Sequence, residues 1–243
     1  ARRLRAGARA ASRPLILQHR LPAYLARLGL AAPPPPTAAG LATLQAAHRQ
    51  AITFENVDVL LGRPILIDSD AVFAKLVERG RGGYCFEQNR LYADMLEALG
   101  FTQRPLLARP RLGLPEGFIG PRTHVLLLVE AAGQAWLADA GFGGSFVPPL
   151  PLADGAEAQT PDGARHRLRR VALPDGEWLV ERAGPRASTD GRAKDHDGWQ
   201  AQYSFDLAPV MPPDLEQANH WTATWPGSRF RAGPVLSRVL PAG

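Results

Sequence analysis

The spacing of apolar residues changes near residue 100, and this change limits the folds that the chain can adopt. Before residue 100, apolar residues recur at helical spacing, for example at Leu21, Tyr24 and Leu25. After it, residues 123–130 and 134–140 form β-rich runs separated by a short Ala-Ala-Gly segment. Because helices precede strands, the sequence predicts segregated α+β modules rather than a sheet of alternating strand–helix units.

Helix-capping residues, glycines and prolines indicate where the individual helices begin and end. Helices are predicted from residue 21, from Thr37, from Ser69 and from Cys85, and glycines or prolines follow the first, third and fourth of them. Residues 1–20 precede the periodic pattern and are predicted to form a basic, flexible extension. Further strands are predicted at 166–173, 177–182 and 200–207, with a turn at 174–176 and a polar, glycine-rich surface loop at 184–198.

Composition excludes several classes of protein. The chain has 243 residues, of which 45% are hydrophobic and 21% charged, as in ordinary globular proteins. Its longest aliphatic run, at residues 125–129, is too short for a membrane span. Its single cysteine excludes a disulfide framework and a cysteine-rich zinc site, and no metal is predicted. The net charge of +5 suits a polyanionic partner or a phosphate-bearing cofactor.

That single cysteine, Cys85, follows Arg81-Gly82-Gly83-Tyr84 at the predicted start of a helix. The glycines allow a tight turn into the helix, and the positive end of the helix dipole favours a thiolate in the first turn. Arg81 is expected to add positive charge, and an ion pair between Glu55 and Arg81 is expected to hold the turn. The sequence therefore favours a nucleophilic cysteine over an inert buried thiol.

A thiolate nucleophile needs a base and a group that orients the base. His124 begins a strongly apolar strand, and Asp139 interrupts the next one. If residues 131 and 132 form a two-residue hairpin loop, His124 and Asp139 lie directly opposite each other, with Cβ atoms about 4.5–5.5 Å apart. A three-residue loop ending in Gly133 would shift the pairing by one residue and separate the two side chains.

The segment Gly141-Phe142-Gly143-Gly144 follows Asp139. It has neither the spacing nor the lysine of a phosphate-binding loop, so it is a weak nucleotide signal. It remains either a plain turn or a loop that allows a ligand to approach the backbone.

Several of these motifs together resemble the arylamine N-acetyltransferase family. They are Phe54-Glu55-Asn56, Arg81 to Asn89, Pro121-Arg122-Thr123-His124, Leu137 to Gly143, Tyr203-Ser204-Phe205 and Asn219 to Phe230. The resemblance covers nearly all of the chain from Leu21 onward. It implies a Cys-His-Asp triad at Cys85, His124 and Asp139.

The resemblance also implies the fold. It predicts an α+β protein with an N-terminal helical bundle, a central β-barrel and a partial C-terminal α/β lid, in a papain-like arrangement of the triad. The expected organisation is an extension at 1–20, a helical domain with the nucleophile at 21–100, a barrel domain with the histidine and aspartate at 101–207, and the truncated start of the lid at 208–243. A truncated lid is expected to bind acetyl-CoA weakly and to admit water.

The function implied is acetyl transfer from acetyl-CoA to arylamines, arylhydrazines or hydrazines by a ping-pong route in the cytoplasm. Gly141, Phe142 and Gly143 match the family's acyl-pocket loop, and Thr123 matches a position near the coenzyme. The alternatives are a macrolactam-forming amide synthase of the same family and a papain-like thiol hydrolase. A nucleic-acid-binding module is a remote alternative, because no aromatic and basic motif supports it. We expect no nucleic-acid or membrane partner, and the oligomeric state stays open.

Overall fold

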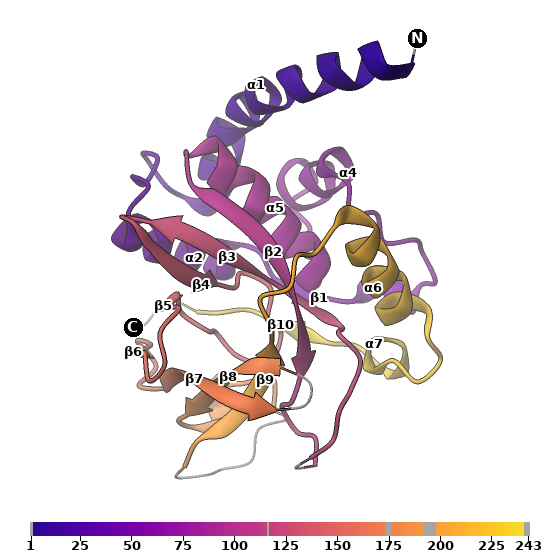
Figure 1. The fold of residues 1–243 in the computed structure, drawn as a ribbon. Helices are drawn as coiled ribbons and strands as arrows, with labels where there is room; N and C mark the ends of the chain where they lie inside the picture. The colour runs from indigo at the N-terminus through magenta and orange to yellow at the C-terminus, as the bar shows by residue number, and fades with distance from the viewer. Residues whose placement is uncertain (1, 116, 174–175, 192–197, 241–243) are drawn as a thin grey trace.

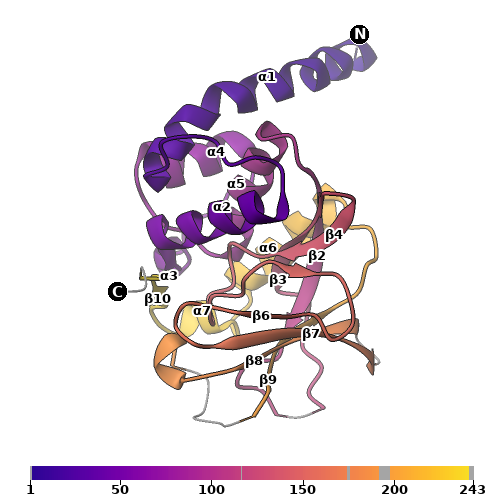
Figure 2. The same cartoon turned by 90° about the vertical axis from the view of Figure 1, so that its left-hand side faces the viewer.

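The computed structural model describes residues 2–115, 117–173, 176–191 and 198–240. At residues 2–12, 173, 176 and 177 the description covers the backbone only. Helices of the N-terminal part gather on one side of the molecule, and a curved sheet forms the other side, as Figures 1 and 2 show from two directions. The predicted α+β arrangement is therefore confirmed. No helix in the described ranges is long and apolar enough to cross a membrane.

The helical side is built from the first hundred residues. Its elements are α1 (Arg2–Leu28), α2 (Ala38–Ala51), the short strand β1 (Phe54–Glu55), α3 (Val57–Leu60), α4 (Ser69–Phe73), a π-helical turn (Ala74–Glu78) and α5 (Cys85–Ala98). Thr37 caps α2 as predicted, by accepting a hydrogen bond from the backbone N–H of Gly40. The cap of α4 is Asp68 and not the predicted Ser69, because the Asp68 carboxylate accepts from the N–H of Ala71.

The first helix begins much earlier than periodicity predicts. Residues 13–20 were expected to belong to a flexible extension, but they continue α1, where Leu17 is only 1% exposed. Arg13 lies 3.3 Å from Asp94, and Arg20 lies 2.7 Å from Asp70. Leu17 continues the helical spacing of Leu21 and Tyr24 by one turn toward the N-terminus, and leucine and arginine are strong helix formers, so the helix extends through this segment despite Pro14. The predicted boundary at residue 20 thus falls inside α1.

The second side is an antiparallel sheet of eight strands within the described ranges. The strands are β2 (Thr102–Pro110), β3 (His124–Ala131), β4 (Gln134–Ala138), β5 (Leu150–Pro151), β6 (Glu157–Gln159), β7 (Arg165–Leu173), β8 (Gly176–Ala183) and β9 (Gln200–Phe205). Their order is β5-β4-β3-β2-β9-β8-β7-β6. Leu150 near one edge and Leu168 near the other belong to the same buried cluster, because the sheet curls around its own core. Residues 174–175 of the predicted turn and 192–197 of the predicted loop lie outside the description.

The hairpin between β3 and β4 differs from the predicted register by two residues. Ala131 pairs with Gln134, so the loop residues are Ala132 and Gly133, whose φ angles are 52° and 75°. Positive φ at both central positions is typical of a type I′ hairpin turn. His124 and Asp139 are therefore not directly opposite each other. Because side chains alternate between faces with a period of two, a shift by two residues leaves them on the same face.

The C-terminal segment returns to the helical side. It contains α6 (Pro212–Thr224), α7 (Arg229–Ala232) and β10 (Leu236–Ser237), and β10 pairs with β1. The Asn56 side chain donates to the carbonyl oxygens of Phe230 and Gly233 and accepts from the N–H of Val235. These contacts hold α7 and β10 against the loop that precedes the nucleophile motif.

Candidate active site

A cavity of about 350 Å³ lies between the start of α5, the loops beside β3 and β4, and the C-terminal end of α6. Its lining includes six of the seven predicted site residues: Cys85, Thr123, His124, Gly141, Phe142 and Gly143. The seventh, Asp139, is 1% exposed and lies behind His124. The fold thus gathers the predicted residues from both sides of the molecule into one place.

Cys85 is the first residue of α5 and is 3% exposed. Its Sγ atom lies 3.8 Å from the carbonyl oxygen of Thr123, the residue before His124. Burial raises the pKa of the Cys85 thiol, and the charge of Asp139 adds to this effect. Backbone hydrogen bonds with Val125 on β3, and with Phe86 and Cys85 at the helix start, act in the opposite direction but are outweighed. The expected preference for a thiolate is therefore not met by Cys85 alone, and its proton needs an acceptor.

Arg81 does not supply the positive charge that the sequence suggested for the thiol. Its guanidinium lies 3.0 Å from Glu55 and 3.0 Å from Asp58, so two carboxylates neutralise it. The predicted Glu55–Arg81 pair is confirmed. It holds the loop that leads into α5, where the backbone N–H of Glu55 also donates to the carbonyl oxygen of Gly83.

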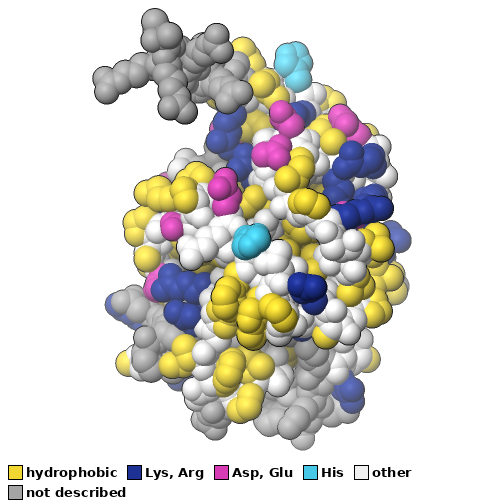
Figure 3. Space-filling model, turned by 90° about the vertical axis from the view of Figure 1, so that its right-hand side faces the viewer, with side chains coloured by type: hydrophobic (Ala, Val, Ile, Leu, Met, Phe, Trp, Pro, Cys, Tyr) yellow, Lys and Arg dark blue, Asp and Glu magenta, His cyan; other side chains and the backbone are white. Residues whose placement is uncertain are grey.

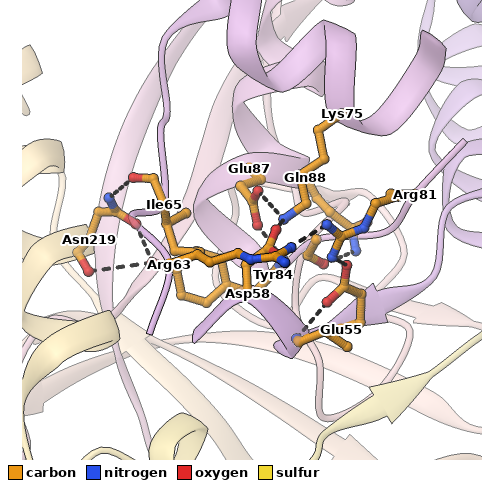
Figure 4. Close-up of polar contacts among 12 residues, drawn as sticks. Glu55, Asp58, Arg63, Ile65, Lys75, Arg81, Tyr84, Glu87, Gln88 and Asn219 are labelled. Carbon is orange, nitrogen blue, oxygen red and sulfur yellow. Dashed lines mark hydrogen bonds and ion pairs between the residues drawn. The ribbon is translucent and has the colours of Figure 1, made fainter. Parts of the chain in front are cut away.

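A further group of buried charges, which sequence reasoning missed, lies behind the start of α5 (Figure 4). Lys75 Nζ lies 2.6 Å from Glu87 Oε1 and 2.7 Å from Asp58 Oδ2. The other oxygen of Glu87 accepts a hydrogen bond from the backbone N–H of Tyr84 at the helix N-cap. This network fixes the first turn of α5 through its cap. Lys75 lies on the π-helical turn, a rare local structure that sequence patterns do not reveal.

His124 and Asp139 form a short, fully buried contact. His124 Nε2 lies 2.6 Å from Asp139 Oδ2. Although burial alone would raise the pKa of Asp139, its interactions with His124, Asn89 and the N–H of Gly141 lower it. Asp139 is therefore held as a carboxylate beside the imidazole, the arrangement that orients a catalytic histidine.

The segment after Asp139 is held by buried polar side chains of α2. Gln45 Oε1 accepts from the backbone N–H of Asp139, and Arg49 donates to the carbonyl oxygens of Ala140 and Phe142. Gln45 is fully buried and Arg49 is 4% exposed. Sequence reasoning missed both residues. The pattern that could have indicated them is two polar residues four positions apart, near Leu41 and Leu44 on the apolar face of a predicted helix.

Two aromatic rings enclose the imidazole. The ring centroids of Phe142 and Tyr203 lie 5.1 and 5.0 Å from that of His124. Phe142 belongs to the predicted loop, whereas Tyr203 comes from β9, in one of the segments that carry the family resemblance. The contacts limit the rotation of the ring and keep its surroundings apolar.

The glycines of the predicted loop are required by close packing. A Cβ atom at Gly141 would lie 2.6 Å from the Asn89 side chain and 2.9 Å from Cys85 Cα. A Cβ atom at Gly143 would lie 2.6 Å from the Phe54 ring. Each glycine therefore lets the loop approach the helical side, and Gly141 brings it directly onto the backbone of Cys85.

The C-terminal end of α6 contributes apolar surface to the cavity. Trp221 and Trp225 are stacked with their ring centroids 5.3 Å apart, and both line the cavity while remaining almost half exposed. Hydrophobic side chains gather near the middle of the face shown in Figure 3, the side on which α6 lies. The lining favours a ligand with apolar or aromatic parts. Within the described residues, no group of three or more metal-ligating side chains occurs.

Known proteins share this arrangement. A family model described as N-acetyltransferase matches residues 37–243. An arylamine N-acetyltransferase / N-hydroxyarylamine O-acetyltransferase of Salmonella typhimurium is 40% identical over 92% of this chain and 74% of its own length. An arylamine N-acetyltransferase of Escherichia coli is also 40% identical, over 84% of this chain and 67% of its own length.

Solved structures agree with the sequence comparisons. The Salmonella typhimurium enzyme superposes with a TM-score of 0.81, covering 92% of this chain and 76% of that one. The Mycobacterium marinum arylamine N-acetyltransferase in complex with CoA superposes with a TM-score of 0.77 at 34% identity, covering 90% of this chain and 77% of that one.

Fold and family model together define an acyltransferase of the N-acetyltransferase class. At this level of identity and coverage, the assignment is narrower still. The chain belongs to the arylamine N-acetyltransferase family.

Proposed function

We propose that this protein transfers an acetyl group from acetyl-CoA to arylamines, arylhydrazines or hydrazines through an acetyl-cysteine at Cys85. The observation that carries the proposal is the 2.6 Å contact between His124 Nε2 and Asp139 Oδ2 beside a cavity that also contains Cys85. A nucleophile, a base and an orienting carboxylate in one cavity are the parts that acyl transfer needs.

In the first half-reaction, Cys85 Sγ forms a bond to the acetyl carbonyl carbon while His124 takes the thiol proton. The base is necessary because burial raises the pKa of the thiol. Asp139 stabilises the imidazolium without becoming protonated, consistent with the lowered pKa of its carboxyl. His124 then gives the proton to the CoA sulfur as the thioester bond breaks.

In the second half-reaction, the amine nitrogen bonds to the acetyl carbon of acetyl-Cys85. His124 takes a proton from the nitrogen and returns it to Cys85 Sγ as the acyl–sulfur bond breaks. Backbone N–H groups at the start of α5, including that of Cys85, are the proposed donors to the oxyanion in both steps.

Thr123, Gly141, Phe142 and Gly143 are the proposed contacts of the acetyl group and the adjoining part of the coenzyme. The cavity fits these groups, because its lining is largely apolar and aromatic and includes Gly141 and Gly143, whose lack of side chains brings the loop close to Cys85 and Phe54. Aromatic residues at the end of α6 are the proposed contacts of the aryl ring. In this scheme residues 208–240 act as a lid over the helical and barrel domains.

We place the enzyme in the cytoplasm as part of the same proposal. Its chemistry needs a reduced thiol, and thiols stay reduced in that compartment. Cys85 is the only cysteine in the chain and is free.

Incubation with acetyl-CoA and aniline tests the proposal. The expected products are acetanilide and CoA in equal amounts from the native protein, and neither from Cys85→Ser. Release of acetate without acetanilide would instead support the hydrolase alternative, and transfer by Cys85→Ser would reject the proposed nucleophile.

A further inference from the structure

Asn89 lies one helical turn after Cys85 on α5 and is 1% exposed. Its Nδ2 atom lies 2.6 Å from the carbonyl oxygen of Val125 and 3.1 Å from Asp139 Oδ1. Its Oδ1 accepts from the N–H of Ala140 at 3.0 Å. Val125 follows His124, and Ala140 follows Asp139. One side chain therefore connects the segments that carry all three members of the proposed triad.

We infer that Asn89 is a positioning residue of the active site, which acts by fixing the Asp139 carboxylate and the strand that carries His124. The inference rests on the proposed triad. It extends the site to a residue that takes no part in bond formation.

The hydrogen-bonding capacity of the Asn89 side chain explains why an amide is suited to this position. An asparagine has two N–H donors and a carbonyl acceptor on one rigid plane. Here both donors and the acceptor have buried partners. An alanine would leave these groups without partners, and a carboxylate would keep the acceptor but lose both donors.

The contacts of Asp139 show how Asn89 acts through it. Asp139 Oδ1 accepts from Asn89 and from the N–H of Gly141, at 3.1 and 2.9 Å. Asp139 Oδ2 is thereby directed to His124 Nε2. Without the hydrogen bond from Asn89, the carboxylate has one fewer restraint on rotation, so it holds the imidazole of His124 less firmly in one orientation.

The charges that face Asp139 come from four elements. They are His124 on β3, Cys85 on α5, Arg49 on α2 and the phenol of Tyr203 on β9. Asn89 adds a neutral donor to this group. An aspartate at position 89 would add a second carboxylate, and two adjacent carboxylates hold one shared proton to unusually high pH.

The variants Asn89→Asp and Asn89→Ala test the inference, with Gln45→Ala as a matched control. Gln45, on α2, is another buried amide, but it contacts Asp139 only through the backbone N–H and otherwise donates to the carbonyl oxygen of Val147. The main readout is the alkylation rate of Cys85 by iodoacetamide between pH 5 and pH 9, well below each protein's unfolding temperature. This rate reports the cysteine–histidine pair without acetyl transfer, so it is independent of the proposed function.

We expect Asn89→Ala to slow alkylation and kcat by about 10- to 100-fold at every pH, with little change in the dissociation constant of acetyl-CoA. In Asn89→Asp the shared proton lets position 89 donate to Asp139 at low pH. That proton is lost as pH rises, so the deficit relative to the native protein should grow with pH. Gln45→Ala should lower the unfolding temperature but follow the native pH profile.

Two results would overturn the inference. One is an Asn89→Ala protein that alkylates and turns over at the native rate. The other is an Asn89→Asp deficit that is constant across the pH range, which is the behaviour of a residue that matters only for folding.

Discussion

The two halves of the proposed active site are held in place by different kinds of interaction. The start of α5, with Cys85, is fixed by ionic groups, in which Lys75 and Arg81 share buried carboxylates. The Asp139 segment is fixed by the neutral amides of Gln45 and Asn89 and by Arg49, which donates there to backbone carbonyl oxygens. Ionic groups change with pH and amides do not. We therefore expect acid to destabilise the start of α5 more than the Asp139 segment. We expect changes in side-chain size or geometry to disturb the Asp139 segment more.

The largest loss of activity is expected from a change at Asp139, on the side of the site that the amides hold. Asp139→Asn should lower kcat by about 10⁴-fold, because an amide favours the wrong imidazole tautomer. The fold should persist, since the substitution keeps the side chain's shape. Steady-state kinetics with aniline and a circular dichroism spectrum check both parts. Near-native activity would remove Asp139 from the triad.

On the ionic side, Lys75→Met should reduce stability by about 3–5 kcal/mol, because it leaves Glu87 and Asp58 without their shared buried cation. Urea unfolding at neutral pH measures the loss. Lys194→Met, which removes the chain's other lysine, controls for the change in net charge. Equal stability of the Lys75 variant and the native protein would show that the network does not hold the start of α5.

Shape sensitivity is tested at the glycines. Gly141→Ala should lower kcat by about 100-fold, because its Cβ would meet the Cys85 backbone and force the loop away from the nucleophile. Gly143→Ala, which would meet the far edge of the Phe54 side chain rather than backbone atoms, should cost less. Kinetics of the two variants under saturating acetyl-CoA decide the order, and the reverse order would contradict the proposed packing.

The smallest effect concerns acid. Ion pairs with Lys75 and Arg81 outweigh burial and lower the pKa of Asp58 to about 2. Since the folded-state pKa lies below that of the unfolded chain, the stabilisation is present above about pH 4 and is lost as pH falls toward 2. The stability difference between native protein and Asp58→Asn should therefore shrink over that interval. A difference that stays constant would contradict the ionic role of Asp58.

Sequence patterns predicted the parts of this molecule that depend on local periodicity and rare residues. The helix-to-strand order and the helix start at Cys85 are local features, and they were confirmed. The pairing of His124 with Asp139 was predicted from a hairpin whose register was wrong. The contact survived because the error of two residues equals one period of a strand.

What the sequence could not provide depends on contacts between distant residues. Arg81 was expected to add positive charge near the thiol, but Glu55 and Asp58 neutralise its guanidinium. The raised pKa of Cys85 follows from burial, which only the assembled fold shows. Lys75 lies 10 residues before Cys85, and Gln45 lies 94 residues before Asp139. No local sequence pattern connects either pair.

A single-turnover labelling measurement tests most directly whether Cys85 carries the acetyl group, as proposed. Protein is mixed with acetyl-CoA in the absence of amine, quenched in acid and analysed by intact mass and peptide mapping. We expect one added acetyl group, located on the peptide that contains Cys85, which disappears when aniline is added before quenching. An unmodified Cys85, or an acetyl group that aniline does not remove, would contradict this expectation.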